Sequence, residues 1–221
     1  CAYDINANKT VVAYQDTGNS GYGSAAVGTI SGTDISFGSE VVFEAATTTN
    51  IGMDYDPSSQ KVVIAYRDGG NSNYGTAIAG IVSGTSISFG SASVFNTANT
   101  TQIAVDRNTV AGLVNILYRD EGNSGITTFS TATVSGTSLT FSSKTAISTG
   151  ASYYNDMTFD STANKMIAVY RDVGNSNYGT SVVFQNAYSS TNLTSENYIG
   201  IASNGYASGQ AATINAKGFI D

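Results

Sequence analysis

The chain has 221 residues, of which 11% are charged, and its 9 basic against 16 acidic side chains give a net charge of −7. This balance argues against a nucleic-acid-binding or membrane-inserting protein, because neither a basic patch nor an apolar run of ~20 residues is present. Histidine is absent, which excludes Ser-His-Asp and Cys-His catalysis and histidine-based zinc or haem sites. We expect no cofactor, and the single Cys1 excludes an internal disulfide.

One motif returns four times along the chain. The stretch YRDGGNS begins at Tyr66, and related stretches begin at Tyr14, Tyr118 and Tyr170, so each step is 52 residues. The tripeptide Ser-Gly-Thr keeps the same step, at residues 31–33, 83–85 and 135–137. A fixed period of this length indicates a tandem structural repeat.

Strand signals follow one another within each repeat. In the second repeat they cover residues 51–56, 61–66, 74–82 and 87–95, with turns at 57–60 and 83–85. The YRDGGNS loop joins the second and third strands, and residues 96–101 lead to the next repeat. No helical period survives the density of Gly, Ser and Thr.

The fold class predicted from these signals is all-β. A four-stranded meander cannot bury both faces alone, and the second strand is apolar on both faces, so each sheet should pack between two neighbours. We therefore predict a β-propeller built of four 52-residue blades, which form either the whole propeller or part of a larger one, followed by a short C-terminal β segment. An open solenoid of stacked sheets is the alternative.

The predicted domain boundary lies near residue 189. Blades occupy residues 1–189, in units that start near 1, 53, 105 and 157, and a divergent β segment occupies 190–221. This segment either closes the ring against the first unit or begins another module. A repeat begins directly at Cys1, which suits an excised piece of a longer chain better than a processed lipoprotein.

The repeated loop should share one face with the links between blades. Asp16, Asp68, Asp120 and Asp172 would then form a ring, with Arg67, Arg119 and Arg171 beside them. The simplest interpretation is structural: Asp heads a turn, Gly and Asn adopt left-handed conformations, and Arg bridges to an acid on the adjacent blade.

A ligand-binding interpretation competes with the structural one. Tyrosines recur after the loop, with Ile126 in place of one, and a tyrosine ring beside amides and carboxylates suits a sugar. The same tyrosines could instead pack between blades. The candidate ligand-binding residues are Tyr22, Arg67, Asp68, Asn71, Tyr74, Arg119, Asp120, Arg171, Asp172, Asn175 and Tyr178.

Catalytic and metal interpretations are weaker. The loop partly matches the Asp box of sialidase propellers, but it lacks the tryptophan, and glutamate is scarce. Calcium loops concentrate more oxygen side chains than this loop offers. We therefore predict a protein that is not an enzyme, with no catalytic and no metal-binding residues.

The array as a whole resembles tandem repeats in proteins of marine phages and marine bacterial metagenomes that are interpreted as tail-fibre or host-attachment proteins. Residues 61–95, VVIAYRDGGNSNYGTAIAGIVSGTSISFGSASVF after Lys61, carry the resemblance most closely, and Gln15 and Ile126 depart from it. The resemblance implies an extracellular or virion-surface location and a cell-surface glycan or protein receptor as partner. Fibre proteins are often trimers, so by analogy alone a homotrimer is an option.

The leading functional hypothesis is non-enzymatic recognition of a cell-surface glycan or receptor by a virion appendage such as a tail fibre. A bacterial surface adhesin or structural spacer built from the same repeats is the second hypothesis, and a sialidase-like glycoside hydrolase is the third. The links at residues 47–50, 96–101 and 147–153 vary more than the strands, which favours binding over a passive spacer.

Overall fold

The computed structural model describes residues 1–185. By its internal contacts the chain divides after Asn186, and the account below concerns the first unit alone. The predicted C-terminal segment 190–221 lies outside the described residues. Within them, regular structure consists of β-strands and two single-turn 3-10 helices, so the all-β prediction is confirmed.

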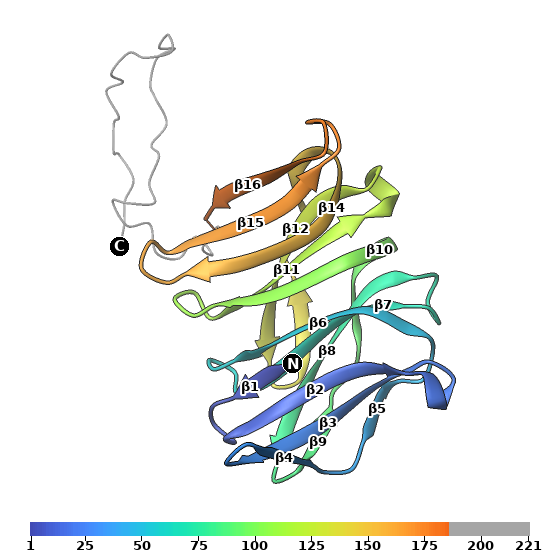
Figure 1. The fold of residues 1–221 in the computed structure, drawn as a ribbon, viewed down its shortest axis with the longest axis vertical. Helices are drawn as coiled ribbons and strands as arrows, with labels where there is room; N and C mark the ends of the chain where they lie inside the picture. Colours follow the sequence, from blue (N-terminus) through green and yellow to red (C-terminus); the bar gives the residue numbers. More distant parts are fainter. Residues whose placement is uncertain (186–221) are drawn as a thin grey trace. The chain divides into compact units, whose positions relative to one another are not determined.

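The strands form four layers in chain order (Figure 1). Layer 1 contains β1 (Ala2–Asp4), β2 (Lys9–Asp16), β3 (Tyr22–Ser31), β4 (Asp34–Phe37) and β5 (Val41–Glu44). Layer 2 contains β6 (Thr48–Asp56), β7 (Lys61–Asp68), β8 (Tyr74–Ser83), β9 (Ser86–Phe89) and the first part of β10 (Ser93–Asn108). Layer 3 contains the rest of β10, β11 (Leu113–Asp120), β12 (Ile126–Ser135), β13 (Ser138–Phe141) and the first part of β14 (Thr145–Asp160). Layer 4 contains the rest of β14, β15 (Lys165–Asp172) and β16 (Tyr178–Phe184).

Each layer is an antiparallel meander, as the sequence predicts. Layer 2 is typical: β6 pairs with β7, β7 with β8, and both β9 and β10 pair with β8. The turn between the first two strands is closed by a side chain at one repeat position. Asp56 accepts hydrogen bonds from the backbone N–H groups of Ser58 and Ser59, and Asp4, Asn108 and Asp160 close the corresponding turns in the same way.

The fourth strand differs from the prediction in two ways. It is broken after Phe89, and its second piece runs on without interruption through the predicted link 96–101 into the next layer as β10. The break brings Gly90 against the Ser-Gly-Thr hairpin of layer 3, where a Cβ would lie 2.5 Å from the carbonyl oxygen of Thr137. Glycine is therefore required at this contact, which a strand pattern alone does not reveal.

Aromatic side chains lock each layer onto the next. Phe43 of layer 1 packs on Tyr66 and Phe89 of layer 2, with ring centroids 5.3 and 5.7 Å apart. Phe95 of layer 2 repeats this contact with Tyr118 and Phe141 of layer 3, at 5.1 and 5.9 Å. The strand residues follow the pleat: Val62, Ile64 and Tyr66 face layer 1, whereas Val63 and Ala65 face layer 3.

The third interface uses different residues. Phe129 of layer 3 and Phe184 of layer 4 meet edge to face with centroids 4.7 Å apart, and Met166 and Ala168 fill the same cluster. Phe184 stands where layers 1 to 3 have Gly28, Gly80 and Ala132. The interface therefore keeps its aromatic character although the repeated Phe has become Ile147.

The described stack is open. Layer 1 and layer 4 lie at opposite ends of its long axis in Figure 1. Tyr14 on the end face of layer 1 is 36% exposed, whereas its repeat equivalents Tyr66 and Tyr118 are fully buried between layers. The predicted propeller arrangement in which these four units close a ring by themselves is therefore wrong for these residues, because a ring would bury both end faces. The open stack of sheets, the alternative prediction from the sequence, describes residues 1–185.

Substitutions at one repeat position should separate an open stack from a closed one. Tyr118→Ala should lower the free energy of unfolding by about 3–5 kcal/mol, because a fully buried aromatic is lost, whereas Tyr14→Ala should cost only ~1 kcal/mol. Urea titration followed by circular dichroism measures both. Equal losses would contradict the open arrangement.

Candidate functional site

The four repeated loops have the same internal support. The Oδ1 atom of the leading aspartate accepts a hydrogen bond from the backbone N–H of the glycine two residues later, at 2.9–3.1 Å. In the second loop, Asp68 also accepts from the N–H of Asn71. The structural interpretation of this aspartate, as the head of a turn, is thus confirmed in every copy.

The loops turn back through left-handed residues. Ser72 and Asn73 have φ of 54° and 62°, and Ser176 and Asn177 repeat them in layer 4. In layers 1 and 3 a 3-10 turn (Thr17–Asn19 and Glu121–Asn123) comes first, and a glycine, Gly21 or Gly125, replaces the second left-handed residue. The predicted left-handed role holds for the glycine or asparagine after the serine, and the serine shares it, but it is wrong for the repeated Gly70 and Asn71 and their equivalents, which have no positive φ.

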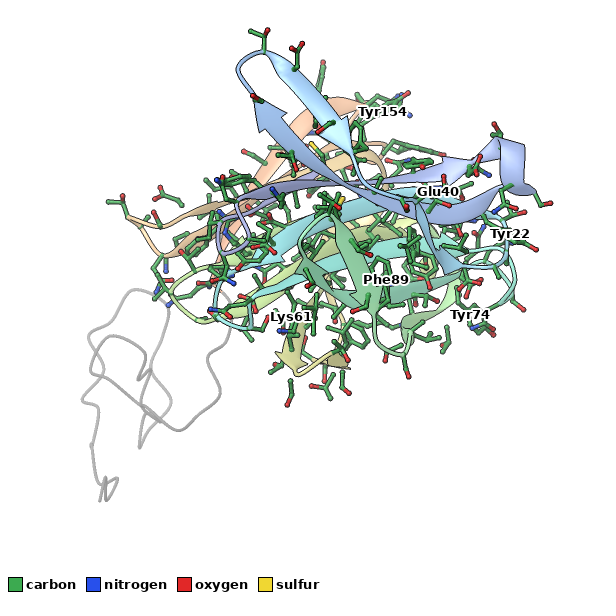
Figure 2. The ribbon with its side chains drawn as sticks, turned by 90° about the horizontal axis from the view of Figure 1, so that it is seen from below. Tyr22, Glu40, Lys61, Tyr74, Phe89 and Tyr154 are labelled. Carbon is green, nitrogen blue, oxygen red and sulfur yellow. The ribbon has the colours of Figure 1, made fainter. Side chains whose placement is uncertain are left out.

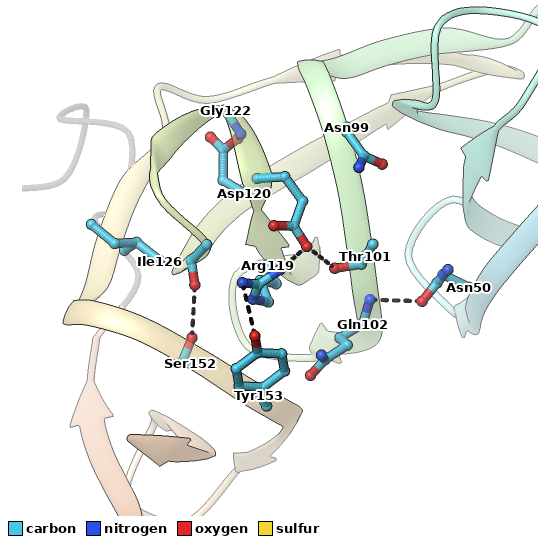
Figure 3. A network of polar contacts seen from close by, with 12 residues as sticks. Asn50, Asn99, Thr101, Gln102, Arg119, Asp120, Gly122, Ile126, Ser152 and Tyr153 are labelled. Carbon is cyan, nitrogen blue, oxygen red and sulfur yellow. Dashed lines mark hydrogen bonds and ion pairs between the residues drawn. The ribbon is translucent and has the colours of Figure 1, made fainter. Parts of the chain in front are cut away.

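The loops and the links between layers lie at one edge, as predicted. Link residues donate backbone hydrogen bonds to the preceding loop: Thr48 N–H to the Gly21 oxygen at 2.9 Å, and Thr100 N–H to the Asn73 oxygen at 3.0 Å. In the third copy the Ser152 N–H makes the same bond to the Gly125 oxygen at 2.9 Å, and the Ser152 hydroxyl donates to the same oxygen (Figure 3). Because the stack is open, the loops form a row, here called the loop edge, and not the predicted ring.

The arginines bind within this edge. Arg67 donates to Asn99 Oδ1 at 2.9 Å and to Thr49 Oγ1 at 3.5 Å. Arg119 forms an ion pair with Glu121 of its own loop (Figure 3). The predicted bridge from Arg to an acid on the adjacent layer is therefore wrong for Arg119, because an acidic residue two positions later is nearer.

The leading aspartates are largely consumed by the scaffold. Asp68 and Asp120 are buried, and Asp120 also accepts from Asn96 Nδ2 at 3.1 Å and has Lys144 Nζ at 3.8 Å. Asp172 in layer 4 is half-buried. These carboxylates therefore serve mainly as caps of the loops, as the structural interpretation predicts.

The exposed candidates are amides and phenols. Asn71 and Asn175 are exposed, and their side chains make no hydrogen bond to other residues in the part of the chain that the structure describes. Tyr22 and Tyr74 are half-buried and lie toward the same side of the molecule in Figure 2. Tyr178 is 65% exposed. The edge therefore presents amides next to partly exposed aromatic rings, on backbone that is already fixed.

Two tyrosines at the edge are not among the predicted ligand-binding residues, although the variable link 147–153 includes the first of them, Tyr153. The guanidinium groups of Arg119 and Arg171 lie 4.4 and 4.7 Å from the ring centroid of Tyr153, and Arg171 lies 5.1 Å from that of Tyr154. The earlier repeats have Thr49 and Thr101 at the first of these positions. This departure from the repeat was the available signal.

A ladder of side chains also crosses the links. The backbone N–H of Gln102 donates to Asn50 Oδ1 at 2.8 Å (Figure 3), and the N–H of Tyr154 donates to Gln102 Oε1. Asn50, Gln102 and Tyr154 occupy one repeat position and all have positive φ. Each link is therefore tied to the next, which holds the loop edge rigid.

Burial perturbs one acid behind the edge. The pKa of Glu44 is raised above its ordinary value, first by burial and then by the negative charge of Asp68. The Tyr66 hydroxyl donates to Glu44 at 3.0 Å, which partly offsets this shift. Burial also raises the pKa of Tyr66, so its hydroxyl stays protonated and remains a donor.

No protein-family model matches the chain, and no curated protein is significantly similar to it. Residues 1–185 contain no cluster of three or more acidic or thiol side chains that could hold a metal ion. In the same range no helix is long and apolar enough to cross a membrane.

Replacement of Glu44 should reveal the cost of its buried charge. A raised folded-state pKa means that the ionised carboxylate destabilises the fold above that pKa, and that the cost disappears as the pH falls through it. Glu44→Gln keeps an acceptor for Tyr66, so its melting temperature should exceed that of the wild type at pH 7. The gain should vanish below about pH 4, near the ordinary carboxyl pKa. A lower melting temperature at pH 7 would contradict this account.

Proposed function

We propose that the chain is a non-enzymatic recognition module of an extracellular or virion-surface appendage, and that its loop edge binds a cell-surface glycan. The observation that supports this proposal is the edge itself. Four loops of one design lie in a row on backbone held by aspartate caps and link hydrogen bonds. Asn71 and Asn175 are exposed on two of them, and three of the loops are followed by a tyrosine.

The chemistry of the edge suits sugars. Exposed amides can donate to and accept from hydroxyl groups, and an aromatic face can stack on the apolar C–H face of a pyranose ring. Because the loops are fixed before binding, little conformational entropy is lost. The four loop aspartates at this edge are used as caps, which supports a binding role over catalysis at the edge.

A structural spacer is the second candidate. The layers are related by one repeat and lock together through the same aromatic contacts, an arrangement suited to a rigid shaft. The resemblance to tail-fibre arrays fits both functions. A spacer has no ligand, so the two candidates differ in a direct binding measurement.

The test is binding of the purified chain to a glycan array, followed by titration of the best ligand. Asn71→Ala/Tyr178→Ala should weaken binding by about tenfold or more, since each lost polar or stacking contact contributes ~1 kcal/mol. The matched control is Asn6→Ala/Tyr3→Ala, which removes the same side-chain types near the β1–β2 turn, at the opposite end of the strands.

The control should bind like the wild type. Absence of binding to any glycan, or an equal loss in both variants, would overturn the glycan proposal. Absence of binding together with normal folding of all three proteins would favour the spacer.

A further inference from the structure

The end face of layer 1 is apolar and exposed. Tyr14, Ile35 and Phe37 are 36%, 45% and 50% exposed, and Ile30 beside them is 61% exposed. At the same repeat positions in layer 2, Tyr66 and Ile87 are buried against layer 1, and Phe89 is partly buried there. This surface therefore has the composition of a buried interface without its partner.

The same face contains a hollow where an internal interface holds a side chain. The hollow has a volume of about 330 Å³ and is lined by Val12, Tyr14, Ala26, Phe37, Gly38 and Glu40. In layer 2, the rings of Tyr66 and Phe89, which correspond to Tyr14 and Phe37, are covered by Phe43 of the preceding layer. The face of layer 1 is thus shaped to receive another layer of the same repeat.

The opposite end of the stack offers a matching surface. Val169 of layer 4 is 43% exposed, although its equivalents Ala65 and Leu117 are fully buried against the next layer. Val183 on the same face is also exposed. The face is hollowed to about 320 Å³ beside Val169, Arg171 and Ser181.

The charges of the two faces are opposite. Glu40 is exposed on the face of layer 1, where it accepts hydrogen bonds from Tyr14 at 2.6 Å and Ser24 at 2.8 Å. Arg171 on the face of layer 4 has neither a hydrogen bond nor an ion pair among residues 1–185. Pairing two layer 1 faces would bring two Glu40 carboxylates into one interface. Head-to-tail pairing instead brings Glu40 of one copy and Arg171 of the other into the same interface.

We propose that the end face of layer 1 binds the end face of layer 4 of a second copy of this chain, head to tail. The contact continues the internal stacking. The face of layer 2 that packs on layer 1 inside the chain corresponds to the face of layer 1 that would pack on layer 4 of the second copy. Such a heterologous contact leaves one free face at each end and can therefore extend into a filament. The inference is independent of glycan binding.

Analytical ultracentrifugation of the full chain over a range of concentrations tests this proposal. We expect reversible self-association. Tyr14→Lys, on the layer 1 face, and Val169→Lys, on the layer 4 face, should each weaken it by roughly 100-fold, because an ammonium group would be buried against apolar surface. Val110→Lys, in the turn between β10 and β11, is the matched control and should associate normally.

Mixing the two variants gives the sharpest readout. Each retains one intact face, so an equimolar mixture should form a 1:1 heterodimer that cannot extend. A wild-type chain that stays monomeric at every concentration would overturn the proposal. So would association blocked by Tyr14→Lys alone, which indicates a two-fold contact, or a closed trimer unaffected by either variant. If the wild-type chain is a monomer and both lysine variants lower its free energy of unfolding, the two end faces meet within one chain. This result would also overturn the proposal.

Discussion

Two of the three interfaces in the described stack depend on one contact, in which a phenylalanine of one layer inserts between a tyrosine and a phenylalanine of the next. Phe43 and Phe95 make this contact at two successive interfaces with nearly the same ring distances. Each phenylalanine lies over a glycine of its own sheet, and a Cβ at Gly75 would come within 2.5 Å of the Phe95 ring. A single sheet of this size cannot bury both faces, so the aromatic contact turns separate meanders into one cooperative unit.

The loop edge follows from this stacking. Because the layers repeat in register, each link passes the preceding loop at the same point and donates one backbone hydrogen bond to it. The loops are thereby held in a row by backbone hydrogen bonds, with no disulfide among the described residues. The same regularity leaves an apolar sheet face without a neighbouring layer at each end of the stack. The fixed loop edge and the proposed association through the end faces therefore both result from the stacking of layers.

The sequence predicts what is local. The first three strands of each layer and the Asp-headed turns follow from patterning and turn chemistry, and the structure confirms them. Ring closure could not be predicted, because it depends on the angle between successive layers, which no side-chain pattern states. The break at Gly90 and the edge residues Tyr153 and Tyr154 depend on contacts with neighbouring layers. They are visible in the sequence only as departures from the expected strand or repeat.

The central claim is best tested by a double-mutant cycle between Phe95→Leu and Tyr118→Leu, with the free energy of unfolding as the readout. The account predicts a favourable coupling of about 0.5–1.5 kcal/mol, as found for aromatic pairs in contact. Phe43→Leu with Tyr118→Leu is the control, because layer 2 separates these rings, and its coupling should be below ~0.5 kcal/mol. Additive losses for Phe95 and Tyr118 would contradict the account, since the layers would then be held by something other than the inserted phenylalanine.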